Sequence, residues 1–218
     1  MTVTDYFSPI ILAHQRLNDW HSIVELLPSL KKFKIHNEEK LNKLENESVQ
    51  NLLSVIAENN ELEKLKDVWQ KLPSYLRKKE SNQLHFIKLL VLFKQMDEAD
   101  RLIKPFFKKN ASDKVVIANV VELFGEINLT NSSQQFSFLE NWYTQSNQAP
   151  NEIYLSLGKI AFNAELWGKA RFYLERSLQV SPSAETYLIM ANTLKKLNDH
   201  ELEGECFKQG LEFVVENK

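Results

Sequence analysis

The stretch that decides the fold is residues 151–182, NEIYLSLGKIAFNAELWGKARFYLERSLQVSP. Apolar residues fall three or four positions apart in each half of this stretch, which is the spacing of one face of an α-helix. The first half carries Gly158, the second half carries Ala170, and Pro182 ends the run. A large side chain at Gly158 or Ala170 would hold two packed helices apart. We therefore predict two short amphipathic helices that pack closely as a pair.

The same pattern recurs along the chain. A shift of 33 residues places Tyr154 on Tyr187 and Leu174 on Phe207. This second copy is weaker, because Glu203 replaces the small residue of its second helix, as expected for a terminal repeat that faces water on one side. A helical hairpin of about 34 residues with Gly, Ala and Pro at these places is typical of the tetratricopeptide repeat. The sequence predicts an all-α fold of the α-α superhelix type.

We predict one tetratricopeptide-like domain over residues 1–218, made of about six antiparallel helix pairs. No Pro/Gly/Ser-rich linker divides the chain. The clearest repeats are 151–183 and 184–216, and the degenerate pairs are 5–34, 37–73, 81–110 and 112–147. The expected caps and breaks are Asn18-Asp19, Asn59-Asn60, Pro73, Ser112-Asp113, Gly125 and Asn131-Ser132-Ser133. We expect Pro28 to bend or end its helix, and residues 115–124 to be helical despite their strand propensity.

The composition fits a helical globular protein and gives no reason to expect nucleic acid as a partner. The chain has 218 residues, 26% of them charged, with only five Gly and six Pro, too few for a turn-rich β protein. Its net charge of −2 gives no electrostatic reason to expect nucleic acid. The single cysteine, Cys206, excludes an internal disulfide and a cysteine-based zinc site, and we expect a buried thiol. No signal peptide and no apolar run long enough to span a bilayer are visible.

The motifs of the common enzyme classes are absent. Gly158-Lys159 and Gly168-Lys169 lack the preceding Gly and the following Ser or Thr of a phosphate-binding loop. No Gly-x-Gly-x-x-Gly or Gly-x-Ser-x-Gly sequence occurs. The five histidines are scattered, and Cys206 precedes Phe207 rather than the Pro of a regulatory haem motif. We predict that the chain is not an enzyme and has no catalytic, metal or cofactor residues.

A binding surface is the functional feature that the repeats do predict. In tetratricopeptide arrays the first helix of each pair lines a concave groove, which suits an extended peptide or a partner helix. The predicted groove residues are Glu152, Leu155, Lys159, Phe162, Asn163, Glu185, Leu188, Asn192, Lys195 and Lys196. The alternative for each of them is a solvated inner surface without a ligand. The tryptophans, which fall in apolar stripes, are expected to pack between helices: Trp20, Trp69, Trp142 and Trp167.

Three segments carry a resemblance to a known family. Residues 139–142 (LENW), 166–171 (LWGKAR) and 19–20 (DW) with LLPSL at 26–30 resemble the C-terminal repeat region of the HemY family, proteobacterial proteins of haem-biosynthesis operons. The resemblance implies an inner-membrane protein with two N-terminal membrane anchors and a cytoplasmic repeat domain, linked to a late step of protohaem synthesis. It also implies that this chain corresponds to the soluble C-terminal piece, without the anchors, and that Met1 need not be the natural start.

Three functional hypotheses follow. The leading one is a non-enzymatic scaffold that holds protein partners, possible haem-biosynthesis enzymes among them, near the inner membrane. The second is a carrier or regulatory module that binds a porphyrin or haem in the groove, using Phe162 and nearby histidines. The third is an enzyme, which the missing motifs disfavour. Neither composition nor motif identifies the partner.

Overall fold

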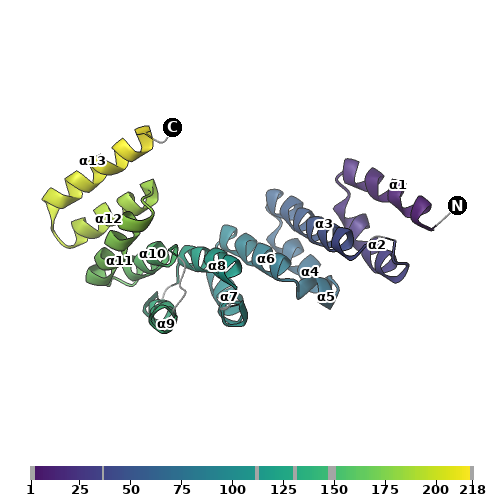
Figure 1. Ribbon diagram of the computed structural model, residues 1–218, viewed down its shortest axis with the longest axis horizontal. Coiled ribbons are helices and arrows are strands. Elements are labelled where there is room, and N and C mark those ends of the chain that lie inside the picture. The colour runs from purple at the N-terminus through teal and green to yellow at the C-terminus, as the bar shows by residue number, and fades with distance from the viewer. Residues whose placement is uncertain (1–2, 36, 111–112, 130–131, 147–150, 217–218) are drawn as a thin grey trace. The chain divides into compact units, whose positions relative to one another are not determined.

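The computed structural model describes residues 3–35, 37–110, 113–129, 132–146 and 151–216. These residues form α-helices joined by turns, with no strand among them, which confirms the predicted fold class (Figure 1). The helices are α1 (Val3–Arg16), α2 (Trp20–Lys32), α3 (Glu38–Glu58), α4 (Leu62–Lys71), α5 (Ser74–Arg77), α6 (Glu80–Leu92), α7 (Met96–Asn110), α8 (Lys114–Glu126), α9 (Ser132–Gln145), α10 (Ile153–Asn163), α11 (Trp167–Val180), α12 (Ala184–Lys196) and α13 (His200–Glu216).

The chain divides into two compact units, residues 1–94 and 95–218. In the first unit, α3 is central and packs against α2, α4 and α6. In the second unit, α8, α10, α11, α12 and α13 pack in succession, and α9 packs on α10. The division falls inside the predicted pair 81–110, and a single domain over 1–218 stays a prediction.

The pair α10–α11 shows why the sequence needs small residues at its centre. Gly158, Ala161 and Ala170 are buried. A Cβ atom added at Gly158 would come within 2.7 Å of the Leu174 side chain, a distance at which two carbon atoms overlap. The predicted close approach at Gly158 is therefore confirmed, and Leu174 fills the space that its missing side chain leaves.

Gly125 has a different role from the predicted one. We expected it to end its helix after Phe124, but α8 continues to Glu126 and Gly125 lies inside it, without a positive φ angle. A Cβ atom there would lie 3.0 Å from the Cα atom of Ser156 in α10. Gly125 thus allows two helices to cross backbone to backbone, a need that a single sequence does not reveal. The helical prediction for residues 115–124 is confirmed.

Most of the predicted caps and breaks lie where the sequence placed them. Asp19 is the N-cap of α2 and accepts a hydrogen bond from the backbone N–H of Ser22 at 3.2 Å. Asn60 adopts a left-handed conformation with φ 58° after α3, and Asp113 accepts from the N–H of Val116 at 3.1 Å. Ser112 and Asn131 lie outside the described residues.

Two local features concern prolines. Pro28 does not end its helix, since α2 runs through it to Lys32. A bend of α2 at Pro28 stays a prediction. Pro73 follows the end of α4, as predicted. The short helix α5 begins directly after Pro73 and lies between the predicted pairs 37–73 and 81–110. A four-residue helix carries too few positions for a periodic signal.

Trp69 and Trp142 pack between helices as predicted, whereas the packing of Trp20 stays a prediction. Trp69 stacks on Phe86 with ring centroids 4.3 Å apart. Trp142 meets the edge of Phe107 at 4.8 Å. These contacts join α4 to α6 in the first unit and α9 to α7 in the second. Cys206, 7% exposed, has the buried thiol that the sequence predicted, and burial raises its pKa.

Candidate functional site

Three helices of the second unit, α8, α10 and α12, are the successive first helices of the predicted repeats. α10 packs on both α8 and α12, and a cavity of about 270 Å³ opens along them. Its lining also includes residues from the end of α11 and the turn after it. The lining residues are Glu122, Glu126, Asn151, Glu152, Leu155, Ser156, Lys159, Ser177, Val180, Ser181, Ser183 and Glu185. We call this cavity the C-terminal groove.

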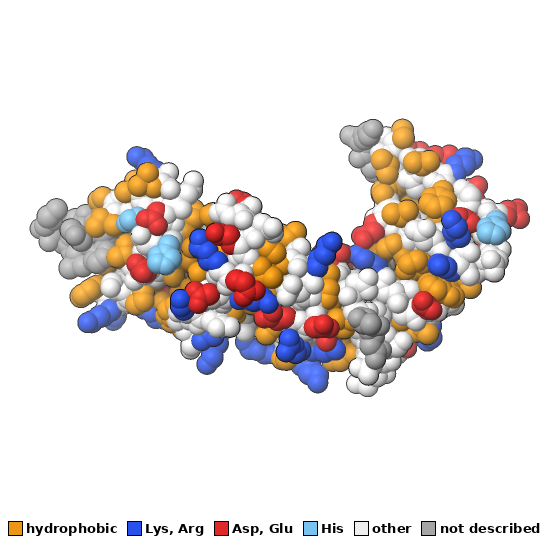
Figure 2. Space-filling view, turned by 180° about the vertical axis from the view of Figure 1, so that it is seen from behind, with side chains coloured by type: hydrophobic (Ala, Val, Ile, Leu, Met, Phe, Trp, Pro, Cys, Tyr) orange, Lys and Arg blue, Asp and Glu red, His pale blue; other side chains and the backbone are white. Residues whose placement is uncertain are grey.

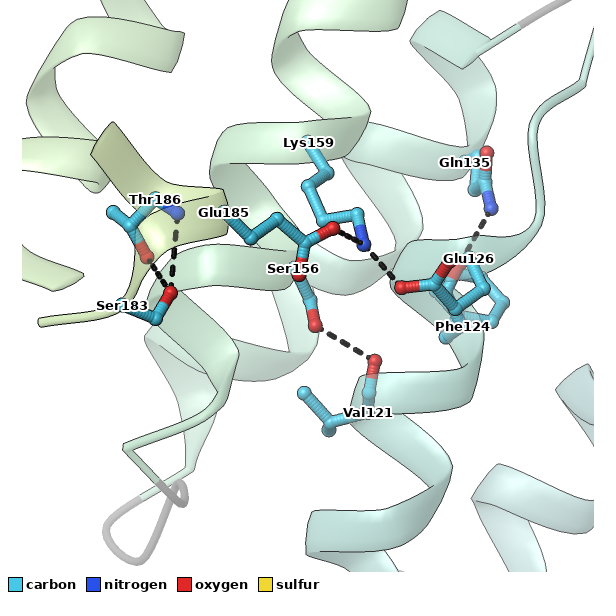
Figure 3. A network of polar contacts seen from close by, with 9 residues as sticks. All are labelled: Val121, Phe124, Glu126, Gln135, Ser156, Lys159, Ser183, Glu185 and Thr186. Atoms are coloured by element: carbon cyan, nitrogen blue, oxygen red, sulfur yellow. Dashed lines mark hydrogen bonds and ion pairs between the residues drawn. The ribbon is translucent and has the colours of Figure 1, made fainter. Parts of the chain in front are cut away.

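Lys159 joins the three helices at one wall of the C-terminal groove (Figure 3). Its ammonium group bonds to Glu126 of α8, and to Glu185 of α12 at 2.6 Å. The Lys159 side chain is only 13% exposed. Burial alone would lower its pKa, but the bonds to the two carboxylates outweigh burial, and the pKa of Lys159 is raised above its ordinary value. Lys159 is therefore a fixed cation at neutral pH.

Buried hydrogen bonds hold this wall in place. The Ser156 hydroxyl donates to the carbonyl of Val121 at 2.8 Å, which ties α10 to α8 beside the Gly125 crossing. Gln135 of α9 donates to the carbonyls of Phe124 and Ile127, at 3.0 and 2.7 Å. Both carbonyls lie at the C-terminal end of α8, where carbonyl groups lack the N–H partners of a continuing helix. The hydrogen bonds of Ser156 and Gln135 thus tie α10 and α9 to the second half of α8.

A second set of contacts fixes the start of α12. Ser183 is its N-cap, and its hydroxyl accepts from the backbone N–H of Thr186 at 3.1 Å (Figure 3). Thr186 is completely buried, and Ser177 of α11 lies 3.4 Å from its hydroxyl. The cap places Glu185 in the first turn of α12, where a carboxylate favours the helix dipole and also reaches Lys159.

Acidic side chains outnumber basic ones in the C-terminal groove. Within the described part of the chain, the lining carries four carboxylates, those of Glu122, Glu126, Glu152 and Glu185, and one ammonium, that of Lys159. Two of the four are bonded to Lys159, so their charges are partly offset. Leu155 and Val180 contribute apolar surface to the same cavity, and the remaining lining is mostly hydroxyl groups. This combination suits a side chain with an apolar stem and a cationic end.

The structure brings together only part of the predicted groove set. Glu152, Leu155, Lys159 and Glu185 line the C-terminal groove. Two others meet at Trp167, where Phe162 contacts its ring edge at 5.3 Å between centroids and the ammonium of Lys196 lies 5.7 Å from its centre.

The other four predicted residues lie on α10 and α12 without lining the cavity. Leu188 is 53% exposed, Asn163 and Lys195 are exposed, and Asn192 is half-buried. The binding role of all ten residues stays a prediction.

Sequence reasoning missed the part of the site that comes from outside α10 and α12. Glu122 and Glu126 lie on α8, which was assigned to the preceding pair, and Val180 and Ser181 end α11. One signal was available. Shifting Lys159 back by 33 residues gives Glu126, so the repeat register itself places these two residues one above the other on adjacent first helices.

Comparison with curated proteins supports the resemblance seen in the sequence. The chain is 21% identical to Protein HemY of Escherichia coli K12 over 205 residues, which cover 94% of this chain and 50% of HemY. The chain resembles HemY along almost its whole length. HemY of Escherichia coli O157:H7 and of Shigella flexneri match equally well. The chain thus spans about half the length of the HemY proteins, and no family model matches it.

Solved structures share the fold. MamA MSR-1 C2 superposes with a TM-score of 0.52 at 12% identity, over 79% of this chain and 98% of that one. The MamA RS-1 ArsTM double mutant gives a TM-score of 0.54 at 11% identity, over 80% and 97%. At these identities the likeness concerns the fold alone, which is that of a tetratricopeptide-like helical repeat protein.

Two further findings concern membranes and metals. Within the described ranges, no helix combines the length and apolar character that crossing a bilayer requires. In the same ranges, no three His, Cys, Asp or Glu side chains are grouped in a way that could hold a metal ion.

Proposed function

We propose that this chain is a protein-interaction module whose C-terminal groove receives a segment of a partner protein. The observation that carries the proposal is the cavity along α8, α10 and α12, with its mixed apolar and charged lining and with the polar contacts that join these helices. Side chains already held by such contacts lose less conformational entropy when a ligand binds. Helical repeat arrays commonly bind peptides in this way, along the surface of their first helices.

The lining also indicates the chemistry of the partner. Lys159 already bonds to Glu126 and Glu185, whereas Glu122 and Glu152 line the same cavity from α8 and from the residue before α10. An entering lysine or arginine side chain could lay its methylene groups against Leu155 and Val180 and direct its charge at those two carboxylates. We infer that the bound segment presents a basic side chain.

The resemblance to HemY supports a finer proposal about where the module acts. In the family that the sequence resembles, the repeat region is attached to the inner membrane through N-terminal anchors and faces the cytoplasm. We propose that this chain holds its partners close to that membrane, with enzymes of haem synthesis as candidate partners. On this proposal it acts as a scaffold and not as an enzyme. Lys159 supports that role, because an ammonium bonded to two carboxylates is a poor proton acceptor or nucleophile.

The alternative of a haem or porphyrin carrier finds less support at this site. The cavity, about 270 Å³, is below the roughly 300–1,000 Å³ of typical small-molecule pockets. Among the residues that the structure describes, those lining the cavity include none of the His, Cys, Met or Tyr side chains that ligate haem iron. Phe162, the aromatic residue on which this alternative partly rested, contacts Trp167.

A peptide-display selection tests the proposed function. A random peptide library would be selected on the immobilised chain, and the affinities of the selected peptides measured by fluorescence anisotropy. We expect enrichment in Lys and Arg, and at least a tenfold loss of affinity in the double variant Glu122→Gln/Glu152→Gln. The matched control is Glu47→Gln/Glu63→Gln, which alters two glutamates of the first unit. Peptides without basic residues, or peptides that bind both double variants equally, would refute the proposed groove.

A titration with haem and with protoporphyrin tests the alternative. The Soret absorbance would be followed against an unrelated repeat protein of similar size. No shift beyond that control is expected. Saturable one-to-one binding that is weakened by replacing one histidine would favour the carrier instead.

A further inference from the structure

Helix α13 leaves an apolar stripe uncovered at the C-terminal end of the second unit. Phe207, Leu211, Val214 and Val215 are exposed by 39, 70, 41 and 71%. They fall at spacings of four, three and one, which places them on one side of the helix. Figure 2 shows hydrophobic side chains exposed at this end of the chain. We call these four residues, together with Gly204, the α13 stripe.

The repeat register shows what kind of element the α13 stripe would contact. In the preceding copy, α11 packs against two helices, α10 on one side and α12 on the other. Within the described residues, α13 packs extensively against one helix, α12. Arg171 lies on the side of α11 that faces the next pair of helices, because its guanidinium is 3.6 Å from the Asp199 carboxylate, just after α12. A shift of 33 residues places Arg171 on Gly204. The side of α13 that carries Gly204 therefore corresponds to the side of α11 from which Arg171 reaches Asp199, and a helix that packed there would cover part of the α13 stripe.

The glycines of this unit differ in what surrounds them. Gly125, Gly158 and Gly210 each lie where a neighbouring helix approaches so closely that a Cβ atom would clash, against Ser156, Leu174 and Tyr187 respectively.

Gly204 lies inside α13, yet a Cβ atom there would meet nothing within 4 Å. A glycine in the interior of a helix costs about 0.5–1 kcal/mol relative to alanine. Gly168 of α11 also has open space around it, so Gly204 is consistent with a helix packed on the stripe but does not by itself require one.

The charges of α13 indicate which kind of partner would bind the α13 stripe. The helix carries five glutamates and one lysine: Glu201, Glu203, Glu205, Glu212, Glu216 and Lys208. A second copy that paired through the same stripe would bring two acidic helices together, and the like charges would oppose association. We propose that the α13 stripe binds an amphipathic helix of a partner protein, with basic residues flanking its apolar face. This second surface is independent of the C-terminal groove.

A helix-display selection tests this proposal. A library with a fixed helical framework and randomised apolar and flanking positions would be selected on the complete chain. The affinities of the selected helices would then be measured by anisotropy. We expect amphipathic helices with Lys or Arg beside the apolar face, and a loss of at least tenfold in Leu211→Gln/Val215→Gln. Both side chains are about 70% exposed, so these variants should fold.

Two controls separate the outcomes. Leu92→Gln changes a leucine of α6 that is 69% exposed and should leave binding unchanged, as should the groove variant Glu122→Gln/Glu152→Gln. Selected helices with acidic or neutral flanks, helices that bind Leu211→Gln/Val215→Gln undiminished, or no selected helix at all would overturn the proposal. So would a dimer, detected by light scattering, that dissociates in Leu211→Gln/Val215→Gln, because a second copy would then be the occupant.

Discussion

Gly158 shows how one residue controls the packing of a helix pair. Leu174 lies so close to it that a Cβ atom would come within 2.7 Å of two side-chain carbons. Leu174 is fully buried, so it cannot move into solvent to make room. Replacing Gly158 by any larger residue would therefore change the crossing of α10 and α11.

Gly158→Ala is expected to lower the free energy of unfolding by about 1–3 kcal/mol, the usual cost of overpacking a core. Urea denaturation of the purified protein measures this change. Gly204→Ala is the matched control. Its new methyl group meets nothing within 4 Å, so the better helix propensity of alanine should raise stability by about 0.5–1 kcal/mol. A stabilising effect at Gly158 would contradict the packing described here.

His85 gives the first unit a sensitivity to acid. Its ring lies between α6 and α3, with Nε2 3.0 Å from the Ser54 hydroxyl. Burial lowers the pKa of His85 below its ordinary 6.5, so the folded state binds a proton less readily than the unfolded chain does. Stability should therefore fall as the pH drops from 6.5 toward the lowered pKa, and should be unaffected by this group above 6.5.

The His85→Gln variant tests this effect. Glutamine can keep a polar group near Ser54 but does not titrate in this range. The stability difference, wild type minus variant, should be smaller at about pH 5 than at about pH 7.5. A difference that is constant with pH, or an NMR titration of His85 at or above the ordinary value, would contradict the expectation.

At the scale of elements, Lys159 links three successive first helices into one ladder, because it bonds to Glu126 of α8 and Glu185 of α12. Lys159→Met keeps much of the apolar stem and removes both ion pairs. We expect a loss of about 1 kcal/mol in unfolding free energy, since both carboxylates are half-exposed and such pairs are individually weak. Lys169→Met is the control, because Lys169 is 55% exposed and forms an ion pair with Glu140, without linking successive first helices. Equal losses in the two variants would argue against the ladder.

The helices themselves were largely predictable from sequence, because their signals are local. Asp19, Asn60 and Asp113 act through hydrogen bonds or backbone angles within a few residues of themselves. Gly125 misled the prediction because its reason lies in another helix, at Ser156. A local rule treats such a glycine as a terminator, whereas only the packed structure shows that it permits a crossing.

The candidate site was only partly predictable, for a related reason. Counting along each repeat found Leu155, Lys159 and Glu185, since each lies on a first helix. It could not show that Phe162 turns toward Trp167 and away from the cavity. The acidic character of the groove depends on Glu122 of α8, which only the stacking of three helices brings into the same cavity.

At the scale of the whole molecule, the open question is whether residues 1–94 and 95–218 unfold together. The sequence predicts a single domain, and helical repeats commonly unfold cooperatively through their interfaces. Leu53→Ala and Leu157→Ala each remove a fully buried side chain, one in each unit. Each should cost about 2–5 kcal/mol.

If the chain is one domain, both variants shift the same urea transition, whether it is followed by circular dichroism or by tryptophan fluorescence. Two transitions, each shifted by only one of the variants, would instead show that the units are separate domains. Hydrogen exchange of the two units measured in the same sample gives an independent reading of the same coupling.

The central claim is that a partner segment binds in the C-terminal groove. The most direct measurement is a map of amide chemical-shift changes on titrating the best basic peptide from the display selection into the isotope-labelled chain. The account predicts that the largest changes cluster at the groove lining, around Leu155, Lys159 and Ser183, and vanish in Glu122→Gln/Glu152→Gln. Changes confined to α13 or to residues 1–94, with the groove unaffected, would contradict it.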